Sequence, residues 1–565
     1  MAAQPSSSLE ALTEAIRRDP EAAARRVLDH EAERHAYLSE RERHQAERAS
    51  YEAERARLAA EQAQQAVALR SADAEIRSLR LQLRKLLEQQ RLARAERFAA
   101  SSERHDLQYR LFDEGEAQAA PETADSEATV RVPAHERQVA KRKPLPADLP
   151  RQVVEHPPER THCDCGSALV RIGTKTSEQL DIIPEQVFVI EHRRGSWKCP
   201  CCEDAVPETA PLPPQPIPKS AASPGLLAFI ATRKYADGLP LYRQSQAFGR
   251  LGIDLPRQTL ARYLVQGGAL LAPLVERLKA HLLAYDVLAL DETRVQVLKE
   301  DGRPAQSQSW MWVAQGGPEA QPAVVYHYDP SRGSAVPRSL LEGYRGYLQT
   351  DGYAGYGAVL EDPAIRGLGC WAHARRRFVR ARKALPKGKP SEKLNQILAW
   401  IQKLYALERR WKLLAPEERA ARRRAEALPI LDKIEVWLSR QDPPPQTLLG
   451  KAIGYLRSEW PRLSVYIEDG RLSIDNNAVE NAIRPFAVGR KNWLFSDRPE
   501  GARSSAVLYS LVETAKLNGL NPYAYLKVLF QQMPTCNGST TDLDALLPWH
   551  VDAEVINSSL VDPSK

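Results

Sequence analysis

Three acidic residues lie at positions where their carboxylates could converge. Asp291 follows the apolar run Val287–Leu290, and Asp351 follows the run Tyr347–Gln349 and precedes a glycine; both runs are typical of strands. Glu480 lies on a helix-like stretch farther along the chain. Carboxylates brought together in this way can hold two divalent metal ions, the usual arrangement for cutting and joining phosphodiesters. Hard oxygen ligands favour Mg²⁺, with Mn²⁺ able to substitute, so the pattern predicts two such ions in one active site.

A single aspartate at a strand end is most simply a turn or capping residue, and two neighbouring acids compete for the same role. Glu292 follows Asp291, but consecutive strand residues point to opposite faces of a sheet. Asp475 opens the segment that contains Glu480, and its context is typical of a helix cap. We therefore expect Asp291, Asp351 and Glu480 to be the catalytic residues and the magnesium ligands.

Basic residues flank the expected acidic centre. The segment Cys370–Phe378 begins a predicted helix with three consecutive arginines, of which at least one should face the acids. A second basic stretch follows Glu480. Basic side chains interleaved with Trp and Phe suit contacts with phosphates and stacking on an unpaired base, although a solvated basic face has the same composition. The expected DNA-binding residues in these segments are His373, Arg375, Arg376, Arg377, Arg484, Arg490, Lys491 and Trp493.

The chain has seven cysteines, most of them in one short segment. Cys163 and Cys165 precede a predicted hairpin, and Cys199 and Cys202 follow it. Two cysteine pairs presented in this way form a four-thiolate site for one structural Zn²⁺, with unmetallated buried thiols as the alternative. The first pair is tightly spaced, so His162 could replace Cys163 as a ligand. The odd total argues against a disulfide framework and for a reducing, cytoplasmic environment.

Length and charge favour a multidomain protein with an anionic partner. The chain has 565 residues, 27% of them charged, and a net charge of +7. No run of 18 or more apolar residues occurs, so a membrane span is not expected. The first ten residues lack the basic and apolar segments of a secretory signal, so export is not expected either.

Residues 1–112 have the composition of a long helical arm. From residue 69 the apolar positions form a heptad pattern, with Leu69, Ile76 and Leu83 at one seam position and Ala72, Leu79 and Leu86 at the other. Three heptads predict a coiled coil, and hence a homo-oligomer, although an amphipathic helix packed on its own protein fits the same pattern.

The remaining segments predict a multidomain α+β protein. A basic Pro-rich linker is expected at 113–160, the zinc-binding module at 161–206 and a second Pro-rich linker at 207–224. Residues 225–282 predict a helical segment in which Gly252 suits a turn, Asp254 a cap, and Leu260 and Leu264 an inward face. This pattern is typical of the second half of a helix-turn-helix, but also of other helical hairpins. Its candidate DNA contacts are Arg257 and Arg262.

Residues 283–515 are expected to form the catalytic domain. Three strands joined by Gly-containing turns predict an antiparallel meander, followed by a helix, a strand, a helix and a strand. This is the order of a ribonuclease H-like fold. A helical insertion at about 380–465 would explain the long interval before Glu480, and a helical tail is expected at 516–565.

With these residues assembled, the chain resembles the DDE transposases of the insertion sequence 66 (IS66) family. The resemblance covers almost the whole chain and is carried by short motifs in a fixed order. The motifs are Thr176–Asp181, Lys234–Asp237, Leu241–Gln244, Asp291–Thr293, Asp351–Tyr353, Cys370–His373, Asp475–Asn477, Arg490–Phe495 and Leu546–His550. Two departures are Phe98-Ala99 in place of a Phe-Gly motif and the tight first cysteine pair.

The resemblance implies that Asp291, Asp351 and Glu480 are the catalytic triad. It implies binding to the terminal inverted repeats of a mobile element, cutting and joining of DNA, and partnership with two small accessory proteins of the same element. The expected location is the bacterial cytoplasm, in association with the nucleoid. The alternative function is a DNA-binding regulator, or an inactive remnant, that uses the zinc and helical segments without catalysis.

Overall fold

The computed structural model describes residues 11, 13–14, 16–97, 187–194, 196–197, 208–209, 211–386, 388 and 390–552. The expected zinc ligands Cys163, Cys165, Cys199 and Cys202, with the alternative His162, lie outside the described residues, as does the linker at 113–160. None of the helices in the described ranges is long and apolar enough to cross a membrane.

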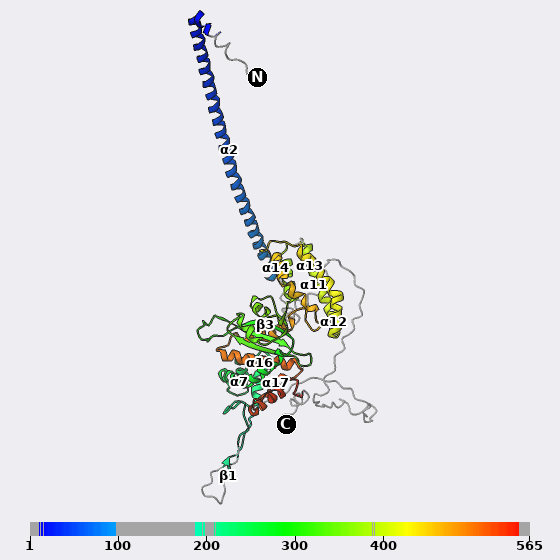
Figure 1. Ribbon diagram of the computed structural model, residues 1–565. Coiled ribbons are helices and arrows are strands. Elements are labelled where there is room, and N and C mark those ends of the chain that lie inside the picture. The colour runs from blue at the N-terminus through cyan, green and yellow to red at the C-terminus, as the bar shows by residue number, and fades with distance from the viewer. Residues whose placement is uncertain are drawn as a thin grey trace, which may run out of the picture.

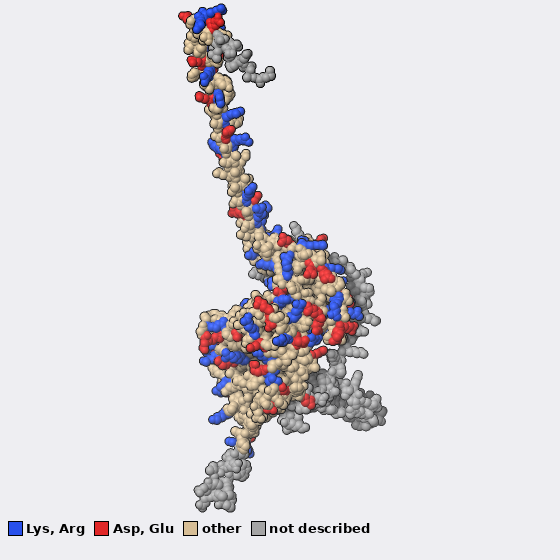
Figure 2. Space-filling view, in the orientation of Figure 1, with Lys and Arg blue, Asp and Glu red and all other residues tan. Residues whose placement is uncertain are grey.

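Helix α2 (Pro20–Arg97) projects from the rest of the molecule as a 78-residue arm (Figure 1). Basic and acidic side chains are interspersed along it (Figure 2). Near its C-terminal end, the carboxylate of Glu88 accepts a hydrogen bond of 3.0 Å from the backbone N–H of Leu448. The large apolar residues of the predicted seam are between 45% and 68% exposed: Leu69, Ile76, Leu79, Leu83 and Leu86. The seam therefore faces solvent in the single chain.

A five-stranded mixed sheet forms the centre of the fold. Strands β3 (Val287–Gln296), β4 (Gln308–Gly316) and β5 (Ala323–Asp329) form an antiparallel meander. Strands β6 (Gly346–Gln349) and β7 (Ile365–Leu368) are parallel to β3, which gives the order β5-β4-β3-β6-β7. Short helices α8 (Ala335–Leu340) and α9 (Gly357–Leu360), with the 3₁₀ turn η1 (Ala354–Tyr356), connect the last three strands. The predicted ribonuclease H-like core is confirmed.

Strand β3 is longer than the apolar run that predicted it. The expectation that it ends at Leu290 is wrong, because pairing with β4 continues through Gln296. The parallel neighbour β6 pairs with only the first three residues of β3, ending at Ala289 beside Gln349. Asp291 therefore lies within β3, two residues beyond the point where the neighbouring strand β6 stops pairing with it.

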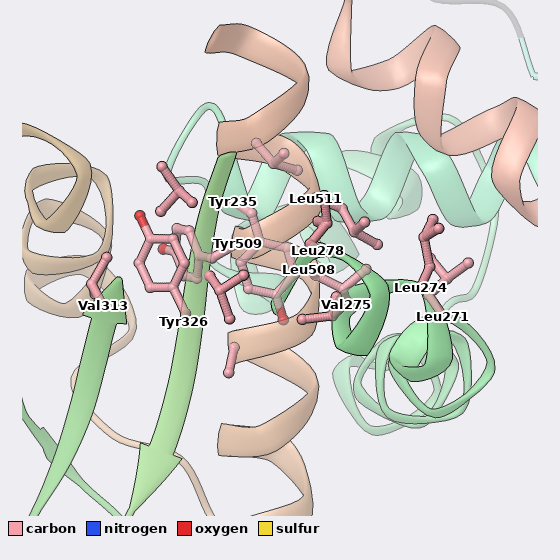
Figure 3. Packing of buried hydrophobic residues seen from close by; sticks show 14 of the residues in the cluster. Tyr235, Leu271, Leu274, Val275, Leu278, Val313, Tyr326, Leu508, Tyr509 and Leu511 are labelled. Atoms are coloured by element: carbon pink, nitrogen blue, oxygen red, sulfur yellow. The ribbon is translucent and has the colours of Figure 1, made fainter. Parts of the chain in front are cut away.

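Helices from distant parts of the sequence cover one face of the sheet. Helix α16 (Pro499–Leu517) packs on β5, and α7 (Arg257–Leu283) packs against α16 and also contacts β5 and β4 (Figure 1). Figure 3 shows Tyr326 of β5, Tyr509 of α16 and Tyr235 of α5 (Pro224–Tyr235) in this interior. The Tyr509 ring lies 4.8 Å from the Tyr235 ring and 5.4 Å from the Tyr326 ring, centre to centre. The helical segment before the sheet thus shares one hydrophobic core with the catalytic fold.

The helix-turn-helix-like segment consists of α6 (Leu241–Arg250) and α7. Gly252 has a φ of 77°, a left-handed conformation that favours glycine in the turn. Leu260 and Leu264 are buried, as predicted. The expectation that Asp254 caps the helix is wrong, because Pro256 occupies the cap position of α7 and no side chain caps it.

The predicted helical insertion forms a second hydrophobic core. The helices of the insertion are α11 (Glu392–Trp411), α12 (Pro416–Arg422), α13 (Leu428–Ser439) and α14 (Leu448–Leu463). Helix α10 (Trp371–Lys383), which follows the last strand, packs into the same core. A π-helical turn, η2 (Arg423–Ala427), joins α12 to α13, and a 3₁₀ turn, η3 (Val465–Ile467), follows α14. Arg423 is buried and binds the Glu408 carboxylate and the backbone carbonyls of residues 466, 469 and 472. Its charge is thus fully paired inside the insertion.

The C-terminal part is helical, as predicted. Helix α15 (Asn477–Trp493) precedes α16, and α17 (Pro522–Gln532), the 3₁₀ turn η4 (Met533–Thr535) and α18 (Thr540–Ala545) follow it. Asp544 accepts hydrogen bonds of 2.8 and 2.9 Å from Arg277 of α7, so the end of the chain is fastened to the core. A two-stranded antiparallel pair, β1 (Ser196–Trp197) and β2 (Glu208–Thr209), lies ahead of α5.

Candidate active site

Asp291 and Asp351 occupy equivalent positions on neighbouring strands. Each lies two residues beyond the last parallel pair, Ala289 and Gln349. The Asp291 Oδ1 accepts a hydrogen bond of 2.8 Å from the backbone N–H of Glu292, and the Asp351 Oδ1 accepts one of 2.9 Å from that of Tyr353. Both carboxylates are therefore oriented by the backbone that follows them.

Glu480 comes from the first turn of α15, which packs across β3 and β4. The hydroxyl of Tyr326 donates a hydrogen bond to the carbonyl of Ala482 and so fastens this turn to the sheet. Glu480 is 6% exposed. A carboxylate buried at this depth is costly unless a cation or hydrogen-bond donors compensate it.

The three acids interact electrostatically. Burial raises the pKa of Asp291 well above its ordinary value, and the charges of Glu292, Asp351 and Glu480 raise it further. Carboxylates that repel one another in this way cannot all ionise without a cation between them. The donor set consists of carboxylate oxygens, which are the preferred ligands of Mg²⁺ and Mn²⁺, so these residues fit such ions.

The two competing acids have other partners. Glu292 accepts a hydrogen bond of 2.7 Å from Arg332 Nε and another from the Tyr356 hydroxyl. Asp475 accepts hydrogen bonds of 2.8 Å from the Tyr405 hydroxyl and 3.1 Å from the backbone N–H of Asn477, the first residue of α15. Because these contacts hold both carboxylates, we interpret Glu292 and Asp475 as structural residues beside the acidic centre.

Helix α10 brings basic groups to Glu480. The Nη2 of Arg376 lies 3.9 Å from one Glu480 oxygen, and the Nδ1 of His373 lies 3.6 Å from the other. Burial and the charge of Arg376 lower the pKa of His373 to about 4, so its imidazole is neutral at pH 7 and the contact is not an ion pair. Arg377 lies over the Tyr455 ring, 4.0 Å from its centre, whereas Arg375 is buried and only 5% exposed.

The basic stretch that follows Glu480 serves partly to hold α15 in place. Arg490 donates hydrogen bonds to the Thr293 hydroxyl, at 3.2 Å, and to the Arg294 carbonyl of β3. Trp493 packs edge-on against Phe486, with ring centres 5.5 Å apart. Four further predicted DNA contacts lie on α7 and α15. Arg257 and Arg262 on α7 and Lys491 on α15 are exposed. Arg484 on α15 is half-buried and donates a hydrogen bond of 2.6 Å to Asn481.

The insertion supplies residues to the site that the sequence did not reveal. Arg462 of α14 donates hydrogen bonds to the Thr350 hydroxyl, to the Leu368 carbonyl at 3.0 Å and to the Asp351 carbonyl at 3.4 Å. Tyr455 of the same helix lies against Gly352, where a Cβ would come within 2.5 Å of its ring. Arg462 therefore binds the ends of both parallel strands. The glycine after Asp351 was the one local signal of this close approach.

Comparison with known sequences decides the family. A family model described as "Transposase IS66 family" matches residues 219–504, which span the sheet, the insertion and Glu480. The chain belongs to the IS66 transposase family. The IS66 match makes the central fold a DDE transposase domain, and this domain implies a divalent metal ion.

Three further family models match segments before and after this region of the IS66 chain. The "zinc-finger binding domain of transposase IS66" matches residues 160–203, so this segment implies zinc. The "Transposase C of IS166 homeodomain" matches residues 85–154 and the "IS66 C-terminal element" matches residues 510–549.

Relatives that match most of this chain occur in Sinorhizobium fredii. The uncharacterized protein y4jD is 34% identical over 74% of this chain and 83% of its own length. The uncharacterized protein y4hP is 32% identical over 81% of this chain and 85% of its own length. The similarity thus extends beyond the catalytic fold of the IS66 chain.

Proposed function

We propose that this transposase cuts DNA at the terminal inverted repeats of its element and joins the resulting 3′ ends to target DNA. Asp291, Asp351 and Glu480 are the proposed catalytic residues. The observation that carries this assignment is geometric: Asp291 and Asp351 each lie two residues beyond the last parallel pair of neighbouring strands, and α15, which carries Glu480, packs on β3, the strand of Asp291. The charges of Asp351 and Glu480 contribute to the raised pKa of Asp291, in agreement with this arrangement. Three acids from different elements that repel one another are expected at a metal-dependent phosphodiester centre.

The same three carboxylates would hold two Mg²⁺ or Mn²⁺ ions. When bound, such ions activate the attacking water or 3′-hydroxyl and stabilise the leaving oxygen. The protein contributes the geometry. Backbone N–H groups orient Asp291 and Asp351, and the Tyr326 hydroxyl fastens the turn that carries Glu480. Arg376 lies beside Glu480 and is placed to contact a scissile phosphate.

The proposed DNA-binding residues divide by what surrounds them. Arg257, Arg262, Arg377 and Lys491 are exposed, and Arg376, Arg484 and His373 are half-buried, so these side chains can reach phosphates. Arg375, Arg490 and Trp493 have buried or internal contacts that support α10 and α15. We therefore assign direct DNA contact to the first two sets and a positioning role to the third.

The zinc assignment concerns residues outside the described ranges. Cys163, Cys165, Cys199 and Cys202 fall within the matched zinc-finger segment and are proposed to hold one structural Zn²⁺, with His162 as the alternative first ligand. Two small accessory proteins of the element are further proposed partners. Because the proposed substrate is DNA, the proposed location is the bacterial cytoplasm, in association with the nucleoid.

A homo-oligomer is proposed to form through the arm. The seam residues of α2 are exposed in the single chain, and pairing with a second chain would bury them. Replacing Leu79→Asp should weaken this pairing by about 100-fold or more, because each chain loses roughly 1.5–3 kcal/mol of burial and gains a charge in the seam. Sedimentation velocity at several concentrations measures the effect.

The matched control for the arm is Ser78→Asp, which adds the same charge outside the seam. It should sediment as the wild type does. A wild-type chain that stays monomeric at all concentrations, or equal behaviour of the two variants, would contradict pairing through the seam.

The reaction is tested with the full-length chain and DNA that carries the sequences flanking the element. With Mg²⁺ or Mn²⁺ we expect nicks that leave 3′-hydroxyl ends, followed by joining to a second DNA. Ca²⁺, which prefers a larger and more variable ligand shell, should allow binding without cutting while leaving zinc bound. Binding of the end DNA without cutting in either active metal would instead favour the DNA-binding regulator.

A further inference from the structure

A second group of metal-ligating side chains lies beside the acidic centre. Within the described residues, Cys370, His373 and Glu480 bring one ligand atom each to within 4.8 Å of one another. Cys370 is the cap residue of α10, His373 lies in the first turn of that helix, and Glu480 lies in the first turn of α15. The cluster therefore joins the starts of two helices.

The surroundings of the cluster fix its ligand atoms. The Cys370 Sγ is buried and accepts a hydrogen bond of 3.3 Å from the backbone N–H of Asn476. The His373 Nδ1 lies 3.6 Å from Glu480 Oε1 and has no hydrogen-bond partner, although it is buried. The His373 side chain is 23% exposed, so an ion can approach from its side.

We propose that Cys370, His373 and Glu480 form a site for one thiophilic divalent ion such as Zn²⁺, distinct from the proposed magnesium site but sharing Glu480 with it. One sulfur, one imidazole nitrogen and one carboxylate oxygen form a set typical of zinc with an open fourth position. Mg²⁺ does not favour such sulfur and nitrogen donors. Binding forms the metal–sulfur bond and releases the Cys370 thiol proton to solvent.

Occupancy of this site should inhibit the transposase. When the Glu480 carboxylate binds Zn²⁺ together with Cys370 and His373, it is no longer available to bind Mg²⁺. Excess Zn²⁺ should therefore slow Mg²⁺-dependent cutting, and more Mg²⁺ should relieve the effect. The inhibition, unlike the binding, rests on the proposed catalytic role of Glu480.

Binding is tested first, on the full-length chain. Cobalt(II) is used as the probe, because cobalt–thiolate bonds absorb in the ultraviolet and bound metal can be counted after dialysis. The wild type should bind one ion more per chain than Cys370→Ser and His373→Asn. Cys536→Ser, which removes the other described free cysteine, should bind as the wild type does. Equal metal counts in all four proteins would overturn the site.

Inhibition is tested by titrating Zn²⁺ into cutting reactions at fixed Mg²⁺, with each rate normalised to that protein's own rate without zinc. Loss of one ligand should raise the zinc concentration for half-inhibition by about tenfold or more in Cys370→Ser and His373→Asn, and not in Cys536→Ser. Equal inhibition of all proteins would overturn the regulatory role. If the wild type cuts no DNA, the proposed function fails and the cobalt count alone decides the site.

Discussion

Replacing Asp291→Asn should abolish DNA cutting and at the same time make the folded protein more stable. The carboxylate is a proposed magnesium ligand, and losing several kcal/mol of transition-state stabilisation lowers the rate by on the order of 10³-fold or more. It is also buried among other acids, which raises its pKa. Removing this unfavourable charge should add about 0.5–2 kcal/mol to the free energy of unfolding.

The stability gain should depend on pH in a defined direction. The pKa of Asp291 is raised in the folded protein, whereas an aspartate in the unfolded chain titrates near 3.9. Below that value both states hold the proton and the variant gains little. As the pH rises above about 4, the unfolded wild type releases its proton more readily than the folded protein, so wild-type stability falls relative to Asp291→Asn. The difference in the free energy of unfolding between the variant and the wild type is largest at and above the pKa that Asp291 has in the folded protein.

Thermal unfolding at several pH values, with and without Mg²⁺, measures this effect. Mg²⁺ should stabilise the wild type more than the variant, and should therefore reduce the difference in stability between the two proteins. Asp301→Asn, at an exposed position, is the matched control and should change neither cutting nor stability. A variant that still cuts, or that is less stable than the wild type at neutral pH, contradicts the assignment of Asp291.

Replacing Arg462→Met should lower cutting by about 100-fold and raise the Mg²⁺ concentration needed for half-maximal rate. Arg462 does not belong to the acidic centre, but it binds the Thr350 hydroxyl and the carbonyls of Asp351 and Leu368. Without it, the strand end that carries Asp351 loses its fixed position, and a displacement of about 1 Å at a reacting centre costs roughly 10²-fold. Cutting assays over a range of Mg²⁺ concentrations separate the two effects.

The matched control for Arg462 lies on the same helix. Arg457 donates hydrogen bonds to the carbonyls of Leu438 and Gln441 within the insertion, at 3.3 and 2.9 Å. Arg457→Met should reduce stability without changing the Mg²⁺ requirement. If both variants shift the Mg²⁺ requirement equally, Arg462 acts through the general stability of the insertion and not through Asp351.

The strand order could be predicted because strands and turns are local signals. The apolar run before Asp291, the glycine after Asp351 and the helical pattern around Glu480 each follow from a few adjacent residues. The extent of β3 was missed, because pairing with β4 extends the strand through polar residues whose own sequence does not indicate it. The catalytic role of the three acids stays a prediction, although the structure places them within electrostatic reach of one another.

The roles of individual basic residues could not be predicted from the sequence. A run of arginines looks the same whether it faces solvent, as Arg377 does, or is buried, as Arg375 is. Arg490 binds β3, which lies nearly two hundred residues earlier, and Arg462 binds the end of β6. Such long-range contacts depend on how the elements pack, and no local pattern encodes them.

The wide spacing of these parts along the chain has a consequence for protein synthesis. Asp291 and Glu480 are separated by 189 residues (480 − 291), which at about 5–20 residues per second takes about 10–40 s to translate. Throughout this interval the nascent chain already has α2 but lacks α15. Translation that stops in this interval would therefore release chains that carry the arm and Asp291 but not Glu480. Through the proposed pairing of the arm, such chains would occupy a full-length partner without supplying Glu480.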